Sequence, residues 1–143
     1  MANWILNAYA QTNPLCTVEM LVQKKAAAYE ENKEEIEKLN ENDIVFLYQN
    51  KVGIIAVGKI TGGLIVKDYI TPDGDRCKAG EYYKELCDFI TFKSPFPYND
   101  LQLLQETGKE LGIRRTLSRL SDATATVILK HLWGITTPKE LCE

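Results

Sequence analysis

The hydrophobic pattern is clearest between Asn42 and Thr61, where two apolar runs flank a short polar break. Asp43–Tyr48 and Gly53–Ile60 are rich in β-branched and aromatic residues, which favour strands. The polar residues Gln49, Asn50 and Lys51 lie between the two runs and have the side chains of a turn. The pattern therefore predicts a β-hairpin.

Both faces of each predicted strand are apolar. Ile44, Phe46 and Tyr48 alternate with Val45 and Leu47, and the second run repeats this arrangement. A strand that is apolar on both faces is buried on both faces. For an antiparallel hairpin, this requires a barrel or sandwich interior on one side and a covering layer, such as a helix, on the other.

Three further segments have strand-like patterns. Asn3–Tyr9 has Trp4 and Leu6 on one side of a short strand, Leu64–Ile70 alternates after a turn at Gly62 and Gly63, and Glu81–Phe92 is long, aromatic and β-prone. A loop over residues 71–80 precedes the last of them, and Pro95 and Pro97 end it. About five strands are expected, enough for a small barrel.

Helical spacing is expected in three places. Thr17 is a candidate N-cap for a helix that runs to Asn40, although 17–24 could instead be extended with a helix from Lys25 onward. Asp100–Leu111 has leucines at helical spacing, and Ser121 is a good N-cap for a last helix that runs to Gly134. The whole pattern predicts an α+β fold, a small mixed β-barrel of about five strands flanked by helices, with residues 1–143 as a single domain.

Composition narrows the class of protein. The formal net charge is −3 and the sequence pI is about 5.3, which argues against a protein that binds nucleic acid mainly by neutralising phosphates. Arg114, Arg115, Arg119 and Lys130 could still form one basic surface, whereas Glu30–Glu41 is acidic and is expected to be a solvated helix face.

The same composition suggests a cytoplasmic protein. There is no signal-peptide pattern, and no apolar stretch approaches the ~18 residues of a membrane span. The four cysteines are irregularly spaced without a CxxC pair, which fits reduced thiols. A single histidine argues against zinc, and Lys78 replaces the glycine that a calcium loop around Asp73 would need. We expect no cofactor and no metal.

Enzyme signatures are missing. The sequence has no GxSxG, P-loop, HExxH or dinucleotide-binding motif. His131 has the features of a capping or surface residue, and nothing fixes the separation of Asp68, Asp73 and Asp75 as a carboxylate pair. We expect a binding protein rather than an enzyme.

Aromatic and amide side chains collect at or beside the predicted strand ends. The aromatic residues are Trp4, Tyr9, Tyr48 and Tyr69, and the polar residues near them in sequence are Asn7, Gln49, Asn50 and Asp68. Each aromatic residue could instead belong to the core. As a set, however, they match what an extruded nucleobase requires, namely aromatic faces for stacking and polar groups that read its edge.

The central hairpin resembles that of the PUA-like superfamily, most closely the EVE domains, which are related to YTH and ASCH domains. The Gly-Asp-like pair is Asn42-Asp43, the strand that ends in Tyr-His-Ser ends here in Tyr48-Gln49-Asn50, and the Gly-Ile-x-x-x-Gly-Lys-like strand is Gly53–Lys59. Arg114–Leu117 is similar to the Arg-Thr-Leu segment that precedes a last helix in PUA-like proteins. The resemblance covers most of the chain in element order but only about one hairpin in sequence.

This resemblance implies a pocket between barrel and helices that accepts a base, often a modified one, flipped from DNA or RNA. In that interpretation Trp4 or Tyr48 stacks on the base, Asn7, Gln49 and Asn50 bind its edge, and Tyr9, Asp68 and Tyr69 complete the pocket. Arg114, Arg115 and Arg119 would bind phosphates. The alternatives are a protein-interaction or regulatory module, for example a phage-encoded one, and an enzyme that acts on nucleotides.

Overall fold

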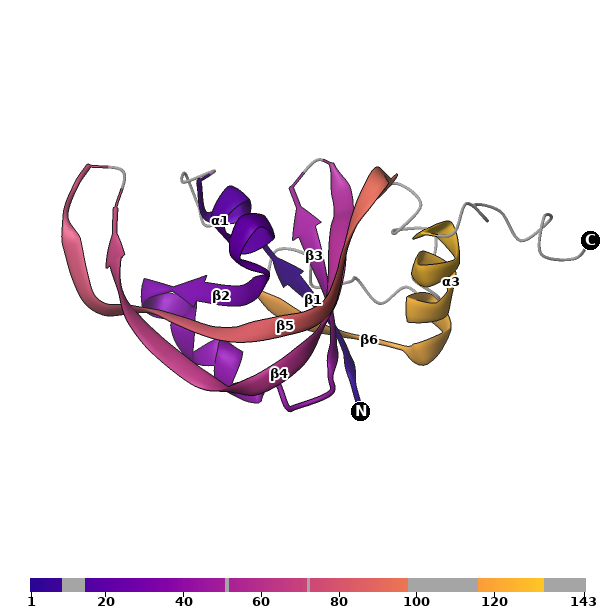
Figure 1. Cartoon of the computed structure of the whole chain (residues 1–143), viewed down its shortest axis with the longest axis horizontal. Helices are drawn as coiled ribbons and strands as arrows, with labels where there is room; N and C mark the ends of the chain where they lie inside the picture. The colour runs from indigo at the N-terminus through magenta and orange to yellow at the C-terminus, as the bar shows by residue number, and fades with distance from the viewer. Residues whose placement is uncertain (9–14, 51, 72, 98–115, 133–143) are drawn as a thin grey trace, which may run out of the picture.

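A computed structural model describes residues 1–8, 15–50, 52–71, 73–97 and 116–132. Within these ranges, six strands form one curled sheet in the order β2-β5-β4-β3-β1-β6 (Figure 1). β1 (Asn3–Asn7) lies between β3 (Ile44–Gln49), to which it is parallel, and β6 (Leu117–Leu120), to which it is antiparallel. The parallel pair needs a crossover, and this crossover consists of α1 (Leu15–Gln23), β2 (Lys25–Tyr29) and η1 (Glu30–Lys38).

The predicted hairpin is confirmed. β3 pairs with β4 (Gly53–Ile70) in antiparallel register from Ile44 opposite Lys59 to Gln49 opposite Gly53, and the amide of Val52 donates to the Gln49 carbonyl in the turn. The register shifts once, after Leu47. Four central residues of β3 are buried in succession, so both faces of the strand are covered, as its double apolar pattern predicts.

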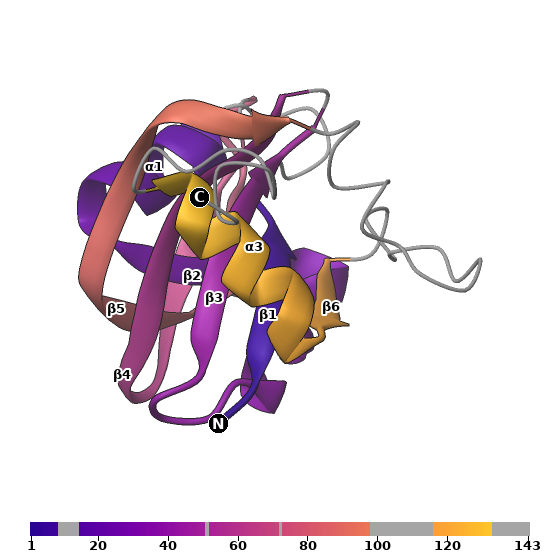
Figure 2. The same cartoon turned by 90° about the vertical axis from the view of Figure 1, so that its right-hand side faces the viewer.

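Two apolar cores explain this double burial. The concave core includes Leu6, Val45, Leu47, Ile55 and Met20 of α1, and it is closed by residues of the crossover. The second core includes Phe46, Tyr48, Ile54, Phe92 and Phe96, and it is covered by α3 (Asp122–Leu132) through Ala125 and Ile128. Figure 2 shows α3 crossing β3 and β1 on the side opposite α1. The helix cover expected for the hairpin is therefore α3.

The start of α3 is also as predicted. The Ser121 hydroxyl accepts from the amide of Thr124 at 3.2 Å, and the Ser121 carbonyl accepts from the amide of Ala125. Both contacts satisfy amides of the first turn, which is what an N-cap does.

The predicted turn at Gly62 and Gly63 is wrong, because β4 continues through both glycines as one strand of 18 residues. β4 advances from Thr61 to Ile65 while its partner β5 (Arg76–Pro97) advances only from Glu85 to Tyr83. The extra residues are accommodated by a bulge that includes Gly62 at a φ of 85°. As a result, β4 and β5 curl together into the long arm that extends beyond α1 in Figure 1.

The single helix expected over 17–40 is wrong, and so is the alternative helix from Lys25. α1 ends at Gln23, Lys24 adopts a φ of 54°, and 25–29 form the strand β2, which pairs with β5. Only then does the acidic segment form η1, a 3-10 helix, with its glutamates largely exposed. The alanines of β2 have low strand propensity, but their small buried side chains fit the space under α1, so packing overrides propensity.

The remaining expectations concern the ends of strands and the last third of the chain. β5 continues through Pro95 to Pro97, so the predicted break there is wrong, and Leu117–Leu120 form a strand that the hydrophobic pattern did not predict. The expected helix Asp100–Leu111 lies outside the described residues. Among the described residues, no helix is both long and apolar enough to cross a membrane.

Candidate functional site

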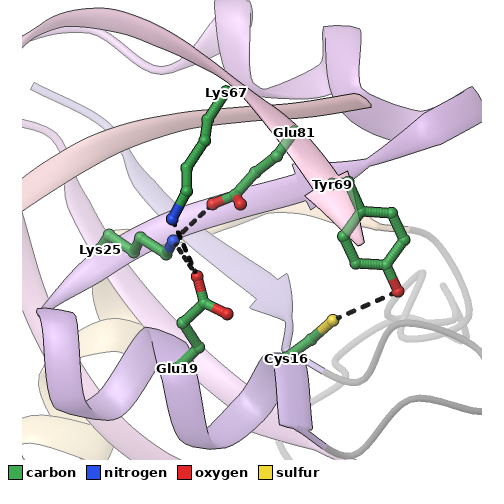
Figure 3. A network of polar contacts seen from close by, with 6 residues as sticks. All are labelled: Cys16, Glu19, Lys25, Lys67, Tyr69 and Glu81. Atoms are coloured by element: carbon green, nitrogen blue, oxygen red, sulfur yellow. Dashed lines mark hydrogen bonds and ion pairs between the residues drawn. The ribbon is translucent and has the colours of Figure 1, made fainter. Parts of the chain in front are cut away.

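A cluster of charged, aromatic and thiol side chains lies where α1 crosses over β2, β4 and β5 (Figure 3). We call it the Lys25 cluster. It comprises Cys16 and Glu19 of α1, Lys25 and Tyr29 of β2, Lys67 and Tyr69 of β4, and Glu81 of β5.

Lys25 is the centre of the charged part. Its side chain is 1% exposed, and its Nζ lies 2.7 Å from Glu19 Oε1 and 2.5 Å from Glu81 Oε2. The same Nζ lies 4.6 Å from the centre of the Tyr83 ring, a cation–π contact. Burial alone would lower the pKa of Lys25, but the two carboxylates outweigh it and the pKa is raised. Lys25 is therefore an ammonium and a hydrogen-bond donor, not a nucleophile.

The outer edge of the cluster is formed by Glu19 and Lys67. The Glu19 side chain is 35% exposed and that of Lys67 is 50% exposed, and Glu19 Oε1 lies 3.8 Å from Lys67 Nζ. Glu81, by contrast, is 3% exposed. The cluster thus leads from solvent at Lys67 to a buried carboxylate at Glu81.

The aromatic part is a pair of buried tyrosines. The ring centres of Tyr29 and Tyr69 lie 4.8 Å apart at a tilt of 45°, and the Tyr69 hydroxyl lies 3.8 Å from Cys16 Sγ. Burial raises the pKa of the Cys16 thiol, although the neighbouring hydroxyls of Tyr69 and Tyr29 oppose the shift. Burial also raises the pKa of Tyr29, with the charges of Glu81 and Glu19 adding to it. Both groups are protonated at neutral pH, so Cys16 is not an activated nucleophile.

Several hydrogen-bonding atoms of the cluster are unused within the described chain. The buried Tyr29 hydroxyl has no hydrogen-bond partner there by distance and angle. Glu19 Oε2 and Glu81 Oε1 also accept no hydrogen bond from described residues, because both lysines approach only the other oxygen of each carboxylate. Buried polar groups are normally satisfied, so the unmet capacity of the Tyr29 hydroxyl is typical of a ligand site, and the two carboxylate oxygens offer further acceptors in the same cluster.

Trp4, Arg119 and Asp43 form a separate group near the start of β1, where Trp4 lies opposite Arg119 of β6. The Trp4 indole donates to Asp43 Oδ2 at 2.9 Å, and the exposed Arg119 guanidinium lies 5.0 Å from the Trp4 ring centre. Trp4 is only 9% exposed and packs in the concave core. Trp4 thus shares the concave core with Tyr29 and Tyr69, but its indole N–H binds Asp43 rather than a residue of the Lys25 cluster.

Tyr48 and its neighbours also lie elsewhere. Tyr48 is 1% exposed in the core under α3, and Asn7 is half-buried opposite it in the β1–β3 ladder. Gln49 ends β3, and Asn50 is exposed in the turn that follows. Tyr48 lies in the core on the opposite face of the sheet from the core that contains Tyr29 and Tyr69.

Asp68 and Tyr69 are adjacent in sequence and point to opposite faces of β4. Asp68 is exposed and accepts from the Ala79 amide at 2.9 Å, whereas Tyr69 is buried in the cluster. Tyr9, Arg114 and Arg115 lie outside the described residues. Tyr69 is therefore the one described member of the predicted site that belongs to the Lys25 cluster.

Sequence reasoning missed the other six members of the cluster. Lys25 and Glu19 were assigned to one long helix with a solvated charged face, and Glu81 to the start of a strand. One signal was present: Lys25 precedes three alanines and Tyr29, a short apolar run that a solvated helix does not need. Within the described chain, no group of three or more histidine, cysteine, aspartate or glutamate side chains could hold a metal ion.

The curled six-stranded sheet with helices on both faces is a PUA-like fold. The human THYN1 protein, solved in complex with DNA containing 5-methylcytosine, superposes with a TM-score of 0.57 at 9% identity, over 92% of this chain and 98% of THYN1. PSPTO5229 from Pseudomonas syringae gives 0.56 at 16% identity, over 92% and 99% of the two chains. Rpa0253 from Rhodopseudomonas palustris gives 0.58 at 11%, over 97% of each.

No family model and no curated protein matches the sequence. At the identities of the structural neighbours, the similarity establishes the fold, as the resemblance in the central hairpin predicted, and leaves the function to be argued from the site.

Proposed function

We propose that this protein is a non-catalytic module that binds a modified nucleobase, flipped out of DNA or RNA, at the Lys25 cluster. The observation that carries the proposal is the unmet hydrogen-bonding capacity of the Tyr29 hydroxyl and the two carboxylate oxygens beside a pair of tyrosine rings. A planar base would use both kinds of group, since its face stacks on an aromatic ring and its edge forms hydrogen bonds.

The free-energy cost of burying these charged groups supports a functional role for the Lys25 cluster. A buried ammonium with two carboxylates is often no more stable than an apolar replacement of the same volume. Lys25 is nearly fully buried and precedes the buried alanines of β2. An apolar side chain could occupy that position, so the retained charges favour recognition over stability.

The fold supports the proposal from a second direction. THYN1, which has a similar fold at low identity, was solved with 5-methylcytosine-containing DNA. If the present chain binds in a comparable way, its low pI implies that phosphate contacts are few. Arg119 is exposed and is the described candidate for such a contact, and we propose the same role for Arg114 and Arg115.

Access to the tyrosines requires α1 to shift, because Cys16, Tyr29 and Tyr69 are all at most 9% exposed. α1 buries only Cys16, Thr17 and Met20, and its polar attachments include Glu19 to Lys25 and the Thr17 hydroxyl to the Ala8 carbonyl. Lys24, at a positive φ, directly follows the helix. A small rotation of α1 about this point would open the cluster at the Glu19–Lys67 edge.

The chemistry of the cluster favours binding over catalysis. An activated nucleophile needs a lowered thiol pKa or a neutral amine, and Cys16 and Lys25 have neither.

Fluorescence anisotropy with labelled single-stranded oligonucleotides, with and without 5-methylcytosine, tests the proposal. We expect binding at low salt and a loss of affinity of about tenfold or more in Tyr69→Leu, the size expected for one stacking contact. Tyr82→Leu is the matched control, because Tyr82 is a half-buried tyrosine of β5 outside the cluster. Absence of binding across a panel of modified bases, or equal affinity of a folded Tyr69→Leu variant, would contradict the proposal.

A further inference from the structure

Each carboxylate of the Lys25 cluster has one occupied and one unoccupied oxygen. Glu81 Oε2 is used by Lys25, and Glu19 Oε1 is shared by Lys25 and Lys67. Figure 3 shows the other oxygen of each carboxylate turned away from the lysines. Glu81 Oε1 and Glu19 Oε2 therefore remain as acceptors within the described chain, and the Tyr29 hydroxyl is a buried third group without a partner.

The donors of the cluster are largely used. Lys25 directs its ammonium to two carboxylates and to the face of Tyr83. Lys67 is half-exposed and has a single ion pair at 3.8 Å, so its remaining donors lie at the solvent edge. A ligand that enters at this edge consequently meets the Glu19 carboxylate and the Lys67 ammonium at the rim and the Glu81 carboxylate inside.

We infer that the cluster selects bases that carry an exocyclic amino group, such as cytosines, over bases with a carbonyl at that position, such as thymine and uracil. This inference rests on the proposed function and names the class of base that the site takes. An amino group donates to a carboxylate oxygen, as in the pairing of acidic side chains with cytosine N4. A carbonyl oxygen in the same place would face a carboxylate oxygen, and the carboxylate would stay desolvated and unpaired.

Lys25 acts here as a positioning residue. It holds Glu19 and Glu81, which come from α1 and β5, on either side of one ammonium and thereby fixes both unoccupied oxygens in one region. A glutamine in place of Glu81 would keep the shape but offer an amide, which can donate as well as accept. Such a variant should accept both classes of base.

The test uses one oligonucleotide sequence with cytosine, 5-methylcytosine, uracil or thymine at a single position, which separates the effect of the amino group from that of the methyl group. We expect the two amino bases to bind about tenfold more tightly than their carbonyl counterparts, with or without the methyl group. In Glu81→Gln the ratio should fall toward one. Glu34→Gln, on the exposed side of η1, should keep the wild-type ratio.

The outcomes are distinguishable. Equal binding of all four oligonucleotides, or a preference for the carbonyl bases, overturns the inference and leaves the proposed function standing. If the protein binds none of these four oligonucleotides and no other oligonucleotide with a modified base, the inference and the proposed function are both overturned. If Glu81→Gln fails to fold, Glu19→Gln serves instead, because Glu19 lies at the exposed edge of the cluster, and an unchanged ratio in that folded variant also overturns the inference.

Discussion

Lys25 and Glu81 form a buried ion pair although they do not face each other across the strands that carry them. In the β2–β5 ladder Lys25 lies opposite Glu85, and Glu81 lies opposite Tyr29. The Lys25 side chain nevertheless places its Nζ 2.5 Å from Glu81 Oε2. The pair therefore depends on the curl of the sheet and on α1 above it, and this dependence makes it sensitive to substitution.

Replacing Lys25 with methionine should destabilise the protein strongly. Loss of one partner leaves the Glu81 carboxylate buried without a counter-charge, a change that costs about 3–5 kcal/mol in comparable sites. Urea unfolding measures the free energy of unfolding. Lys38→Met is the matched control, since the Lys38–Glu35 pair is solvent-exposed and should contribute less than ~1 kcal/mol. Adding Glu81→Leu to Lys25→Met should recover part of the loss, and a further loss in the double variant would contradict this account.

The carboxylate of Asp43 should give stability a pH dependence. It accepts from the Ala2 amide and the Trp4 indole at 2.9 Å each and from the Asn40 amide at 3.0 Å. Burial alone would raise the pKa of Asp43, but these hydrogen bonds and the N-terminal charge hold it below the usual pKa of an aspartate. Because the folded pKa lies below the unfolded one, the contribution is present above the unfolded pKa and is lost as pH falls through the folded pKa.

In Asp43→Asn this contribution should be missing. Unfolding measured between neutral and acidic pH should show a less stable protein at pH 7, by about 1–3 kcal/mol, with a weaker decline toward acid. Asp73→Asn, at an exposed position in the β4–β5 turn, should keep the wild-type profile. An Asp43→Asn profile parallel to that of the wild type would show that this carboxylate is not the source of the pH dependence.

Gly53 should not tolerate a side chain. Its φ is 130°, and a Cβ atom there would lie 1.9 Å from the carbonyl oxygen of Phe96 on β5. Gly53→Ala should therefore lower the free energy of unfolding by about 1–3 kcal/mol or more. A Cβ atom at Gly63 would meet nothing within 4 Å, so Gly63→Ala should change stability by less than ~0.5 kcal/mol. Equal effects in thermal or urea unfolding would contradict the described β4–β5 register.

The cysteines should report on the position of α1. Cys16 is 2% exposed and burial raises its pKa, whereas Cys87 is half-buried on β5. In native protein, alkylation followed by mass spectrometry should find Cys87 modified faster than Cys16. Glu19→Gln weakens the attachment of α1 to Lys25 and should speed the reaction of Cys16 while leaving Cys87 unchanged. Rapid native labelling of Cys16 in the wild type would mean that α1 does not cover the cluster.

The sequence allowed prediction of those parts of the fold that local pattern specifies. The double apolar alternation of 44–48 required two covering layers, and the Ser121 hydroxyl had a recognisable capping role. The crossover could not be predicted in the same way, because Ala26, Ala27 and Ala28 favour helix locally and become a strand only through pairing with β5. The bulge at Gly62 likewise depends on the register with β5, which two adjacent glycines alone do not specify.

The candidate site was less predictable than the fold, for a physical reason. Glu19, Lys25 and Glu81 come from α1, β2 and β5, and nothing local distinguishes them from the many solvated charges of the chain. Tyr69 could be selected because aromatic residues at strand ends are candidates for a barrel pocket. Trp4 and Tyr48 met the same criterion, but Tyr48 packs in the other core and the Trp4 indole binds Asp43.

The central claim is that the base binds at the Lys25 cluster. The most direct test removes the hydroxyl of one tyrosine at a time, first at Tyr29 and then at Tyr48. Both hydroxyls are buried, but Tyr29 belongs to the Lys25 cluster, whereas Tyr48 packs in the core under α3. We predict that Tyr29→Phe leaves stability unchanged or slightly higher and weakens binding of a 5-methylcytosine oligonucleotide by about 2- to 10-fold, the value of one hydrogen bond. Tyr48→Phe should bind as the wild type does. Weakened binding in Tyr48→Phe with wild-type affinity in Tyr29→Phe would contradict the assignment of the base to the Lys25 cluster.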